Sequence, residues 1–579
     1  MVHAGIQGTM HRTRPAVSFS KLQASFPFRF SAAILAVLFY SFFLRNTRTE
    51  IAAQTQEPAS TAVAERYAGD QACAKCHQEI FIHYQETAMA HASGPIAGHV
   101  IPGEFTHKPS GVRYRIKEEN GRVWLYFDRD VGDVIHGKRE LLYYIGSGHL
   151  GRTYIFAEGG FYFEAPVNWY GQKQIWDMTP AYQEARHVPL NLPLYSSCVT
   201  CHVSIAENPA PGTTNKYQEP LMTQHGIGCE RCHGAGAAHA SGGGAIINPA
   251  KLSAVRRDSV CMQCHLEGNA AIPQPGRRLN DFRPGDDLQD YVHYFVLSGP
   301  GRDLRAGSQF EALAESVCKR KSGDALSCIS CHDPHYAPKE AEKAGYYRAK
   351  CLACHAKPAG NMGKHFGEGR DCIGCHMPRV DSVDVAHTQA TDHRIPRYVK
   401  QVSPPAQPQV QPELRSFPPA QRKTNDRDLA LAWHALADSE VQGALMEEEK
   451  YLKRAVKEFP DDPALLSALG FLYQRQHKLE LARSLEERAV QKDPLDTVAA
   501  TDLGVIAAQT GNLKEAERLW RQAFEREPGS SAIGLNLSKA LITEGKREEA
   551  RETVERVLEF NPDLPEAEQL LERMSRAQH

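Results

Sequence analysis

The sequence predicts a mainly α protein that carries a small β-rich insert and ends in a solenoid of paired helices. Three observations lead to this class. Seven short Cys-x-x-Cys-His segments lie between residues 73 and 376, and each is short enough for one helical turn. Residues 100 to 190 alternate apolar and polar side chains around glycine turns, which is typical of strands. From residue 426 onward, a 34-residue periodicity accompanies helical patterning.

The repeated Cys-x-x-Cys-His segment is the attachment sequence of a c-type haem. Two thiols on one turn add to the haem vinyl groups, and the adjacent imidazole binds the iron. Chance would place about 0.02 copies in a chain with 15 Cys and 26 His, so we expect seven covalently bound haem c groups. The attachment cysteines are Cys73, Cys76, Cys198, Cys201, Cys229, Cys232, Cys261, Cys264, Cys328, Cys331, Cys351, Cys354, Cys372 and Cys375. The proximal iron ligands are His77, His202, His233, His265, His332, His355 and His376.

Two other uses of cysteine fit the spacing less well. Structural zinc would pair two half-sites through four ligands and would not require a His directly after every second Cys. Disulfide-bonded cysteines have no need of a His at a fixed offset. The balance of 67 basic and 69 acidic residues, a formal net charge of -2, gives no indication of nucleic-acid binding.

Residues 1–64 are predicted to hold a signal or anchor and a leader. An apolar run from Phe30 to Leu44 follows four basic residues. It is shorter than the roughly 20 residues of a transmembrane helix, but no small-residue cleavage site follows it directly. A cleaved signal and an uncleaved membrane anchor both stay open. Either predicts export to the periplasmic side of the cytoplasmic membrane, where c-type haem attachment is completed.

Residues 65–400 form the expected haem domain, with the β-rich insert at about 100–190. The segment 111–128 alternates around Asn120-Gly121, the strongest short hairpin signal in the chain. A second hairpin is expected around Gly159-Gly160. Elsewhere in this domain Gly, Pro, Ala and His are frequent, so we expect short helices around each motif and a core made of haems.

A linker and a repeat domain follow. Residues 401–425 contain six prolines and predict a semi-rigid, extended linker. In residues 426–579, prolines recur every 34 residues at Pro460, Pro494, Pro528 and Pro562. The pattern of Leu469, Gly470, Tyr473, Ala482, Ala489 and Pro494 resembles the tetratricopeptide repeat, an α-solenoid that docks proteins or peptides. Glu448 and Ser538 depart from the pattern, which indicates terminal, capping repeats.

Each haem iron needs a second axial ligand or stays open to substrate. The haem domain has fourteen histidines outside the motifs, and this surplus favours bis-histidine haems. His239 and His335 lie shortly after motifs, across turns, and are the first candidates. The other candidate distal ligands are His387, His393, His149, His91, His293 and His365. Met89 and Met377 are thioether alternatives.

Cys318 is the one cysteine outside the motifs, ten residues before Cys328. Its thiol could lie near a haem edge, ligate an iron, pair with another chain or be buried and inert.

The segments GIGCERCHGAGAAH, CISCHDPH and CIGCHMP resemble the multihaem cytochrome c superfamily, over roughly residues 65 to 400. That superfamily includes tetrahaem electron carriers, pentahaem nitrite reductase, hydroxylamine oxidoreductase and octahaem tetrathionate reductase. The chain lacks the Cys-x-x-Cys-Lys motif of the nitrite reductase branch. The resemblance implies haem packing more than a reaction.

Two functions are weighed on this basis. The first is electron transfer along closely packed haems, with redox partner proteins docked by the repeat domain. The alternative is an oxidoreductase with one open haem that acts on a small nitrogen or sulfur oxyanion. For that enzyme the first haem is the candidate, with Tyr143, Tyr144, His149, Arg152 and Tyr154 near it in the sequence and Cys318 as a further weak candidate. A redox-sensing scaffold is a third, weaker interpretation.

Overall fold

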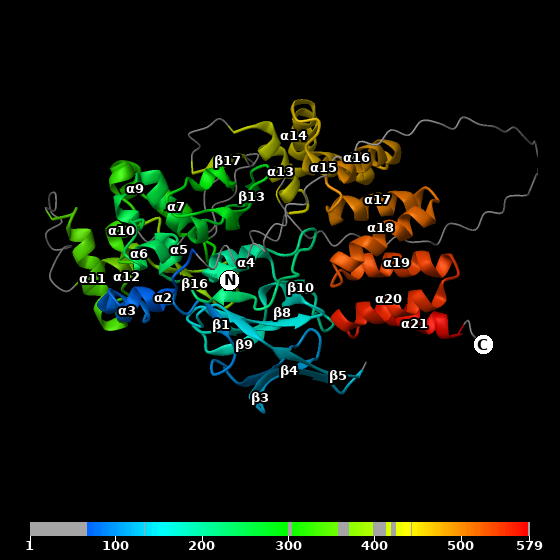
Figure 1. Ribbon diagram of the computed structural model, residues 1–579, viewed down its shortest axis with the longest axis horizontal. Coiled ribbons are helices and arrows are strands. Elements are labelled where there is room, and N and C mark those ends of the chain that lie inside the picture. Colours follow the sequence, from blue (N-terminus) through cyan, green and yellow to red (C-terminus); the bar gives the residue numbers. More distant parts are fainter. Residues whose placement is uncertain are drawn as a thin grey trace, which may run out of the picture.

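The β-rich insert consists of two antiparallel sheets (Figure 1). The computed structural model describes residues 66–132, 134–298, 304–356, 370–397, 413–418, 424–439, 441 and 443–576. The first sheet has the order β1-β6-β7-β8-β10, with β9 paired to β8. Its strands are β1 Ser93–Pro95, β6 Tyr143–Ile145, β7 Gly151–Glu158, β8 Phe161–Tyr170, β9 Ile175–Met178 and β10 Leu192–Pro193. The second contains β2 Gly103–Thr106, β3 Arg113–Glu119, β4 Arg122–Arg129 and β5 Ile135–Leu141, in chain order.

Both predicted hairpins are confirmed. Strands β3 and β4 pair in antiparallel register across Asn120 and Gly121, whose φ angles of 53° and 74° suit the tight turn that Asn-Gly favours. Strands β7 and β8 pair across Gly159-Gly160. The apolar faces of the two sheets share one core, in which Tyr114, Leu125 and Phe156 are fully buried. The insert therefore has its own core, independent of haem.

The haem domain around the insert is built from short helices, as expected. The helices that carry motif residues are α2 Asp70–Ala74, α4 Ser196–His202, α5 Cys229–His233, α7 Ala254–His265, α10 Cys328–Cys331, α11 Glu340–Leu352 and α12 Cys372–His376. The remaining α-helices are α3 Gln78–Tyr84, α6 Ala237–Ala240, α8 Gln309–Glu315 and α9 Val317–Ser322. Short 3-10 turns lie at Pro180–Tyr182, Pro249–Lys251, Leu279–Asp281, Leu288–Asp290 and Gly323–Ala325.

Three small sheets connect these helices. Strands β11 Ile205–Ala206 and β12 Met222–Gln224 form one pair, and β15 Arg379–Asp381 and β16 Gln389–Thr391 form another. The third has the order β13-β14-β17, with strands β13 Ala270–Pro273, β14 Val292–Leu297 and β17 Leu414–Phe417. Strand β17 corrects the expectation of a linker at these four residues, because Leu414 and Phe417 are buried in the sheet. Most of the predicted linker, residues 401–412 and 419–423, lies outside the described residues.

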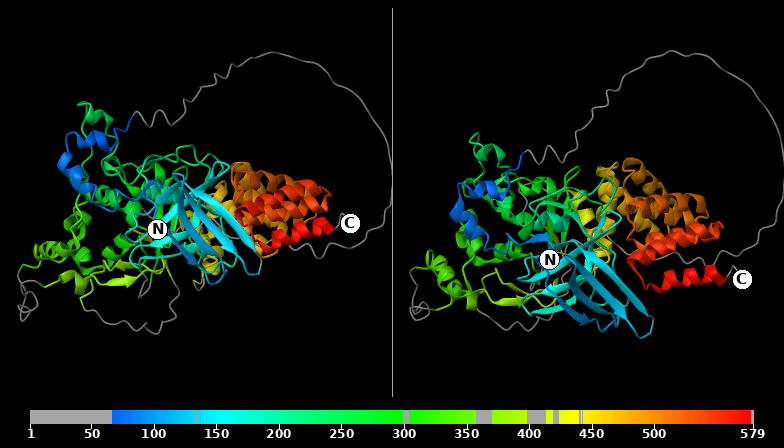
Figure 2. Two further views of the ribbon diagram at one scale, coloured as in Figure 1. Left: turned by 90° about the horizontal axis from the view of Figure 1, so that it is seen from below. Right: turned by 60° about the horizontal axis from the view of Figure 1, so that its bottom comes forward.

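The C-terminal part is a stack of helix pairs, which confirms the predicted solenoid (Figure 2). Its helices are α13 Asp426–Leu436, α14 Ala444–Glu458, α15 Pro463–Arg475, α16 Leu479–Lys492, α17 Thr497–Gln509, α18 Leu513–Arg526, α19 Ser531–Thr543, α20 Arg547–Phe560 and α21 Pro565–Arg576. Glu448, which stands where a small residue is expected, is fully buried and accepts a hydrogen bond of 2.7 Å from His434 Nδ1. This pair compensates for the irregular first repeat.

The last repeats of the solenoid pack against the insert, beside strands β8 and β10 in Figure 1. The ring of Phe560 lies 4.8 Å from that of Phe163, and the Phe560 carbonyl accepts a hydrogen bond from Leu190 N. Asp563 pairs with Arg129 at 3.0 Å and accepts a bond from Val188 N. These contacts come from the turns between repeats, so one edge of the solenoid is occupied by the insert.

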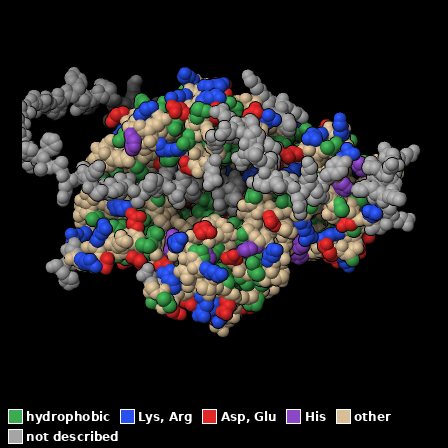
Figure 3. Space-filling view, turned by 180° about the vertical axis from the view of Figure 1, so that it is seen from behind, with side chains coloured by type: hydrophobic (Ala, Val, Ile, Leu, Met, Phe, Trp, Pro, Cys, Tyr) green, Lys and Arg blue, Asp and Glu red, His purple; other side chains and the backbone are tan. Residues whose placement is uncertain are grey.

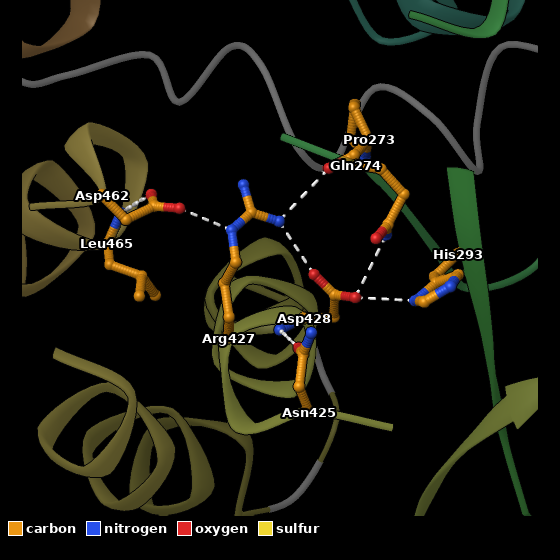
Figure 4. Close-up of polar contacts among 8 residues, drawn as sticks. All are labelled: Pro273, Gln274, His293, Asn425, Arg427, Asp428, Asp462 and Leu465. Atoms are coloured by element: carbon orange, nitrogen blue, oxygen red, sulfur yellow. Dashed lines mark hydrogen bonds and ion pairs between the residues drawn. The ribbon is translucent and has the colours of Figure 1, made fainter. Parts of the chain in front are cut away.

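The first repeat is anchored separately (Figure 4). Asp428 of α13 is fully buried and accepts hydrogen bonds from His293 Nδ1 at 2.6 Å, Gln274 Nε2 at 3.1 Å and Arg427 at 2.8 Å. Burial alone would raise the pKa of Asp428, but these hydrogen bonds outweigh it and hold the pKa below its ordinary value. Arg427 also bonds Asp462 of the next repeat. The solenoid is thus fixed to the haem domain at both ends.

The outer surface carries mixed charge. On the face in Figure 3, Lys and Arg side chains are interspersed with Asp and Glu, in agreement with the net charge of -2. No helix within the described ranges is long and apolar enough to cross a membrane, and the run from Phe30 to Leu44 lies outside those ranges.

A contact between the solenoid and the loop that joins β11 to β12 predicts a pH dependence of stability. Glu527 accepts a hydrogen bond from Thr214, and burial raises its pKa from 4.5 to about 7. Because the folded state binds this proton more tightly than the unfolded state, the stability that it contributes is lost as the pH rises from about 4.5 to about 7. Gln at position 527 cannot titrate. Between pH 4.5 and 8 we therefore expect the free energy of unfolding of Glu527→Gln, measured in urea titrations, to fall by about 1 to 3 kcal/mol less than that of the wild type. Glu525→Gln, at an exposed position of α18, the helix that ends just before Glu527, should follow the wild type, and parallel pH profiles for all three proteins would contradict the assignment.

Candidate haem-binding sites

The attachment cysteines lie in or directly after short helices, so each pair of thiols is presented on one turn. All 15 cysteines are free thiols in this structure. Within the described ranges, no group of three or more His, Cys, Asp or Glu side chains is arranged to hold a metal ion by itself, as a four-ligand zinc site would require. The paired thiols on each turn suit haem attachment.

Three motif histidines face a histidine from elsewhere in the chain. The ring centroids of His77 and His239 are 6.4 Å apart, with planes inclined by 11°. Those of His233 and His335 are 5.8 Å apart and inclined by 15°. Those of His332 and His393 are 6.2 Å apart and inclined by 31°. These separations exceed ring-to-ring contact and leave room for an atom between the rings.

Hydrogen bonds fix the rings of three of these six histidines through Nδ1. His233 Nδ1 lies 2.7 Å from the Ile247 carbonyl, and His239 Nδ1 lies 3.0 Å from that of Gly244. His393 Nδ1 lies 2.9 Å from the Thr391 carbonyl. A ring held at Nδ1 turns Nε2 outward, which is how proteins orient imidazoles that bind metals.

Desolvation by the surrounding protein lowers the pKa of His332 to about 4, with a contribution from the neighbouring His393, and it lowers the pKa of His393 as well. Neutral imidazole is the form that binds iron, because its ring nitrogen then has a free electron pair. Orientation and protonation state both favour ligation.

Two further motif histidines are oriented in the same manner. His265 Nδ1 lies 3.1 Å from Gln309 Oε1, and His376 Nδ1 lies 2.9 Å from the Pro396 carbonyl.

The other candidate distal ligands lie in different settings. His91 and His149 are exposed, and His91 Nε2 contacts the Gln85 carbonyl at 2.7 Å. His387 Nε2 contacts Asp177 at 2.7 Å. His293 extends from β14 toward α13. The adjacent Tyr294 points to the other side of the strand, where it lies near the Cys201 and Cys264 thiols, so His293 faces away from those thiols. His365 lies outside the described residues. Their role as iron ligands stays a prediction.

Thiols from different motifs approach one another. The Cys73 and Cys229 thiols act on each other's pKa, and Cys372 contributes to the raised pKa of Cys351. Cys201 likewise acts on the pKa of Cys264, and Cys261 on that of Cys328. Neighbouring haem sites are therefore adjacent in space, including sites that are distant in sequence.

The residues weighed for an open catalytic haem meet in part, because the Arg152 guanidinium lies 4.1 Å from the centre of the Tyr144 ring and its charge acts on Tyr154. Arg152 is buried and donates to three backbone carbonyls, those of Gly146, Ser147 and His99. Tyr154 is fully buried against Trp176, and His149 is exposed. The guanidinium of Arg152 thus stabilises loops of the insert. Cys318 is half-buried in α9. Burial raises the pKa of the Cys331 thiol, and the nearby Cys318 thiol adds to that rise.

The sequence analysis did not identify Glu164. Its side chain is buried in β8 and accepts a hydrogen bond of 3.4 Å from the Cys198 thiol. A charged residue inside the apolar run FYFEAPV is the signal that could have revealed it.

Comparisons with known proteins match a cytochrome family and a repeat family in separate parts of the chain. A model of the family "Cytochrome c554 and c-prime" matches residues 173–234, and a tetratricopeptide repeat model matches residues 507–574. The multiheme cytochrome MtrA of Shewanella baltica (strain OS185) is 23% identical over 180 residues, 28% of this chain and 53% of the relative. The dissimilatory sulfite reductase MccA of Wolinella succinogenes is 24% identical over 197 residues, 30% of this chain and 25% of the relative. The chain thus spans about half the length of the first relative and a quarter of the second.

Solved structures similar to this chain include the crystal structure of MamA protein, with 18% identity and a TM-score of 0.21 over 23% of this chain and 72% of that one. Another is the first tetratricopeptide repeat domain of Spaghetti (RPAP3) bound to an HSP90 peptide, with 25% identity and a TM-score of 0.19 over 20% of this chain and 92% of that one. With the family models and relatives, the sequence motifs show a multihaem cytochrome fused to a tetratricopeptide repeat domain.

The facing histidines can be tested by substitution. We expect His239→Ala, His335→Ala and His393→Ala each to convert one haem from low-spin to high-spin, because the iron loses its second strong ligand. The measurement is electron paramagnetic resonance of the oxidised, haem-loaded protein. His136→Ala, an exposed histidine of the insert, is the matched control and should leave every signal in place. Wild-type spectra from all three variants would contradict the assignment.

Proposed function

We propose that this protein is an exported c-type cytochrome that carries electrons through seven haems, most of them bound by two histidines. The observation that carries the proposal is the set of three facing histidine pairs at 5.8 to 6.4 Å. Two imidazoles on opposite sides of one metal, each at a bond length of about 2 Å, place their ring centroids about 6 Å apart. Bound haem supplies one-electron redox chemistry, which two histidine ligands direct toward electron transfer.

The histidine pairs also indicate which haem sites are neighbours. His239 follows the third motif, His335 the fifth and His393 the seventh, whereas their partners belong to the first, third and fifth motifs. Each of the odd-numbered sites therefore shares a short peptide segment with the next. Thiols that act on each other's pKa connect the second site to the fourth, the fourth to the fifth and the sixth to the seventh. Together these links join all seven sites into one network.

The repeat domain supplies a place for redox partner proteins. Its edge of inter-repeat turns is occupied by the insert, so a partner would dock on the remaining faces. Exposed apolar side chains on those helices include Leu445, Met446 and Leu481. The apolar N-terminal run supports export, with the protein soluble or anchored at the periplasmic side of the membrane.

The alternative is an oxidoreductase that acts on a small sulfur or nitrogen oxyanion at one open haem. The similarity to MccA, named as a sulfite reductase, is the observation that favours it. It would require a motif histidine with no second ligand across the iron.

One spectroscopic experiment separates the two functions. The oxidised, haem-loaded protein is examined by electron paramagnetic resonance before and after addition of nitrite, hydroxylamine or sulfite. Electron transfer predicts low-spin haems whose spectra do not respond to any of the three. A high-spin haem that shifts on addition of one of them would contradict it and support the enzyme.

A further inference from the structure

A buried carboxylate lies beside the second haem-attachment site. Glu164 is 1% exposed and lies in β8, where nearly every residue is buried. Its Oε1 accepts a hydrogen bond of 3.4 Å from the Sγ of Cys198, the first attachment cysteine of that site. We propose that Glu164 lowers the reduction potential of the haem attached at Cys198 and Cys201 by holding a negative charge next to the attachment sulfur. This inference rests on haem attachment at that motif, as in the proposed function.

The position of the carboxylate is fixed by the sheet. Glu164 lies opposite Ile155 of β7 and Leu192 of β10, so its backbone is paired on both sides. Tyr195 immediately precedes α4, the helix that carries Cys198. Burial raises the pKa of Tyr195, and the charges of Glu527, Cys198 and Glu164 add to the effect, which places Glu164 close to the start of that helix. The backbone of Glu164 is therefore held in place beside this site.

Haem attachment would change the hydrogen bonding of Glu164 and would leave its position in β8 unchanged. A thioether sulfur has no proton to donate, so the hydrogen bond from Cys198 ends once the carbon–sulfur bond has formed. With haem attached there, the carboxylate would lie beside the thioether sulfur, in a buried setting where charges interact more strongly than in solution. An anion in that place favours the more positive, oxidised state of the iron and lowers the reduction potential.

The test is a spectroelectrochemical titration of the full-length, haem-loaded protein. Glu164→Gln keeps the shape of the side chain and removes the charge, so we expect one haem transition to move to higher potential while the others stay in place. Glu164→Met, a second neutral side chain of similar length, should move the same transition in the same direction. Glu164→Asp keeps the charge and should stay closer to wild type than either. Glu104→Gln, at an exposed position of the same insert, is the matched control and should leave all transitions unchanged.

Two results would overturn the proposal. In the first, both neutral variants titrate as the wild type does. In the second, Glu164→Asp shifts as far as Glu164→Gln, which would mean that packing and not charge is responsible. The outcome is independent of the choice between carrier and enzyme, because the potential of this haem can be measured whether or not another haem binds nitrite or sulfite.

Discussion

The pairing of motif histidines with histidines from elsewhere in the chain is the interaction on which the arrangement of the haem domain depends. A Cys-x-x-Cys-His turn supplies one histidine, and a second must come from elsewhere in the chain. Here His239, His335 and His393 each lie opposite the histidine of an earlier motif. In the proposed function, short helices with little apolar core of their own would be joined through the ligands that they exchange. The arrangement that completes each site also brings neighbouring sites together.

The insert and the solenoid supply the rigidity that the haem domain lacks. The insert has a continuous core of aromatic and aliphatic side chains, and its strand β8 carries Glu164 to the second attachment site. The solenoid is fixed to the insert by Phe560 and Asp563 and to the β13-β14-β17 sheet by Asp428. Because contacts anchor the solenoid near both of its ends, the repeats are packed against the rest of the protein.

Local sequence patterns predicted the helices and strands well, but they could not predict contacts between residues that are distant in the sequence. Asn120-Gly121 specifies its hairpin because the turn conformation depends on those two residues alone. The 34-residue period specified the solenoid for a similar reason, since each repeat contacts mainly its neighbours. The sequence could identify His239 and His335 as candidate ligands from their turns, but not the motif each would face. The contact between His293 and Asp428 joins residues 135 positions apart, and β17 lies in a proline-rich segment, so neither left a local pattern.

The most direct test of the central claim is an electron cryomicroscopy or crystal structure of the haem-loaded protein at a resolution that places each iron. The account predicts an iron between His77 and His239, another between His233 and His335, and a third between His332 and His393, each with Nε2 of both rings as axial ligands. Irons bound by the motif histidines alone, or by other distal side chains at these three sites, would contradict it.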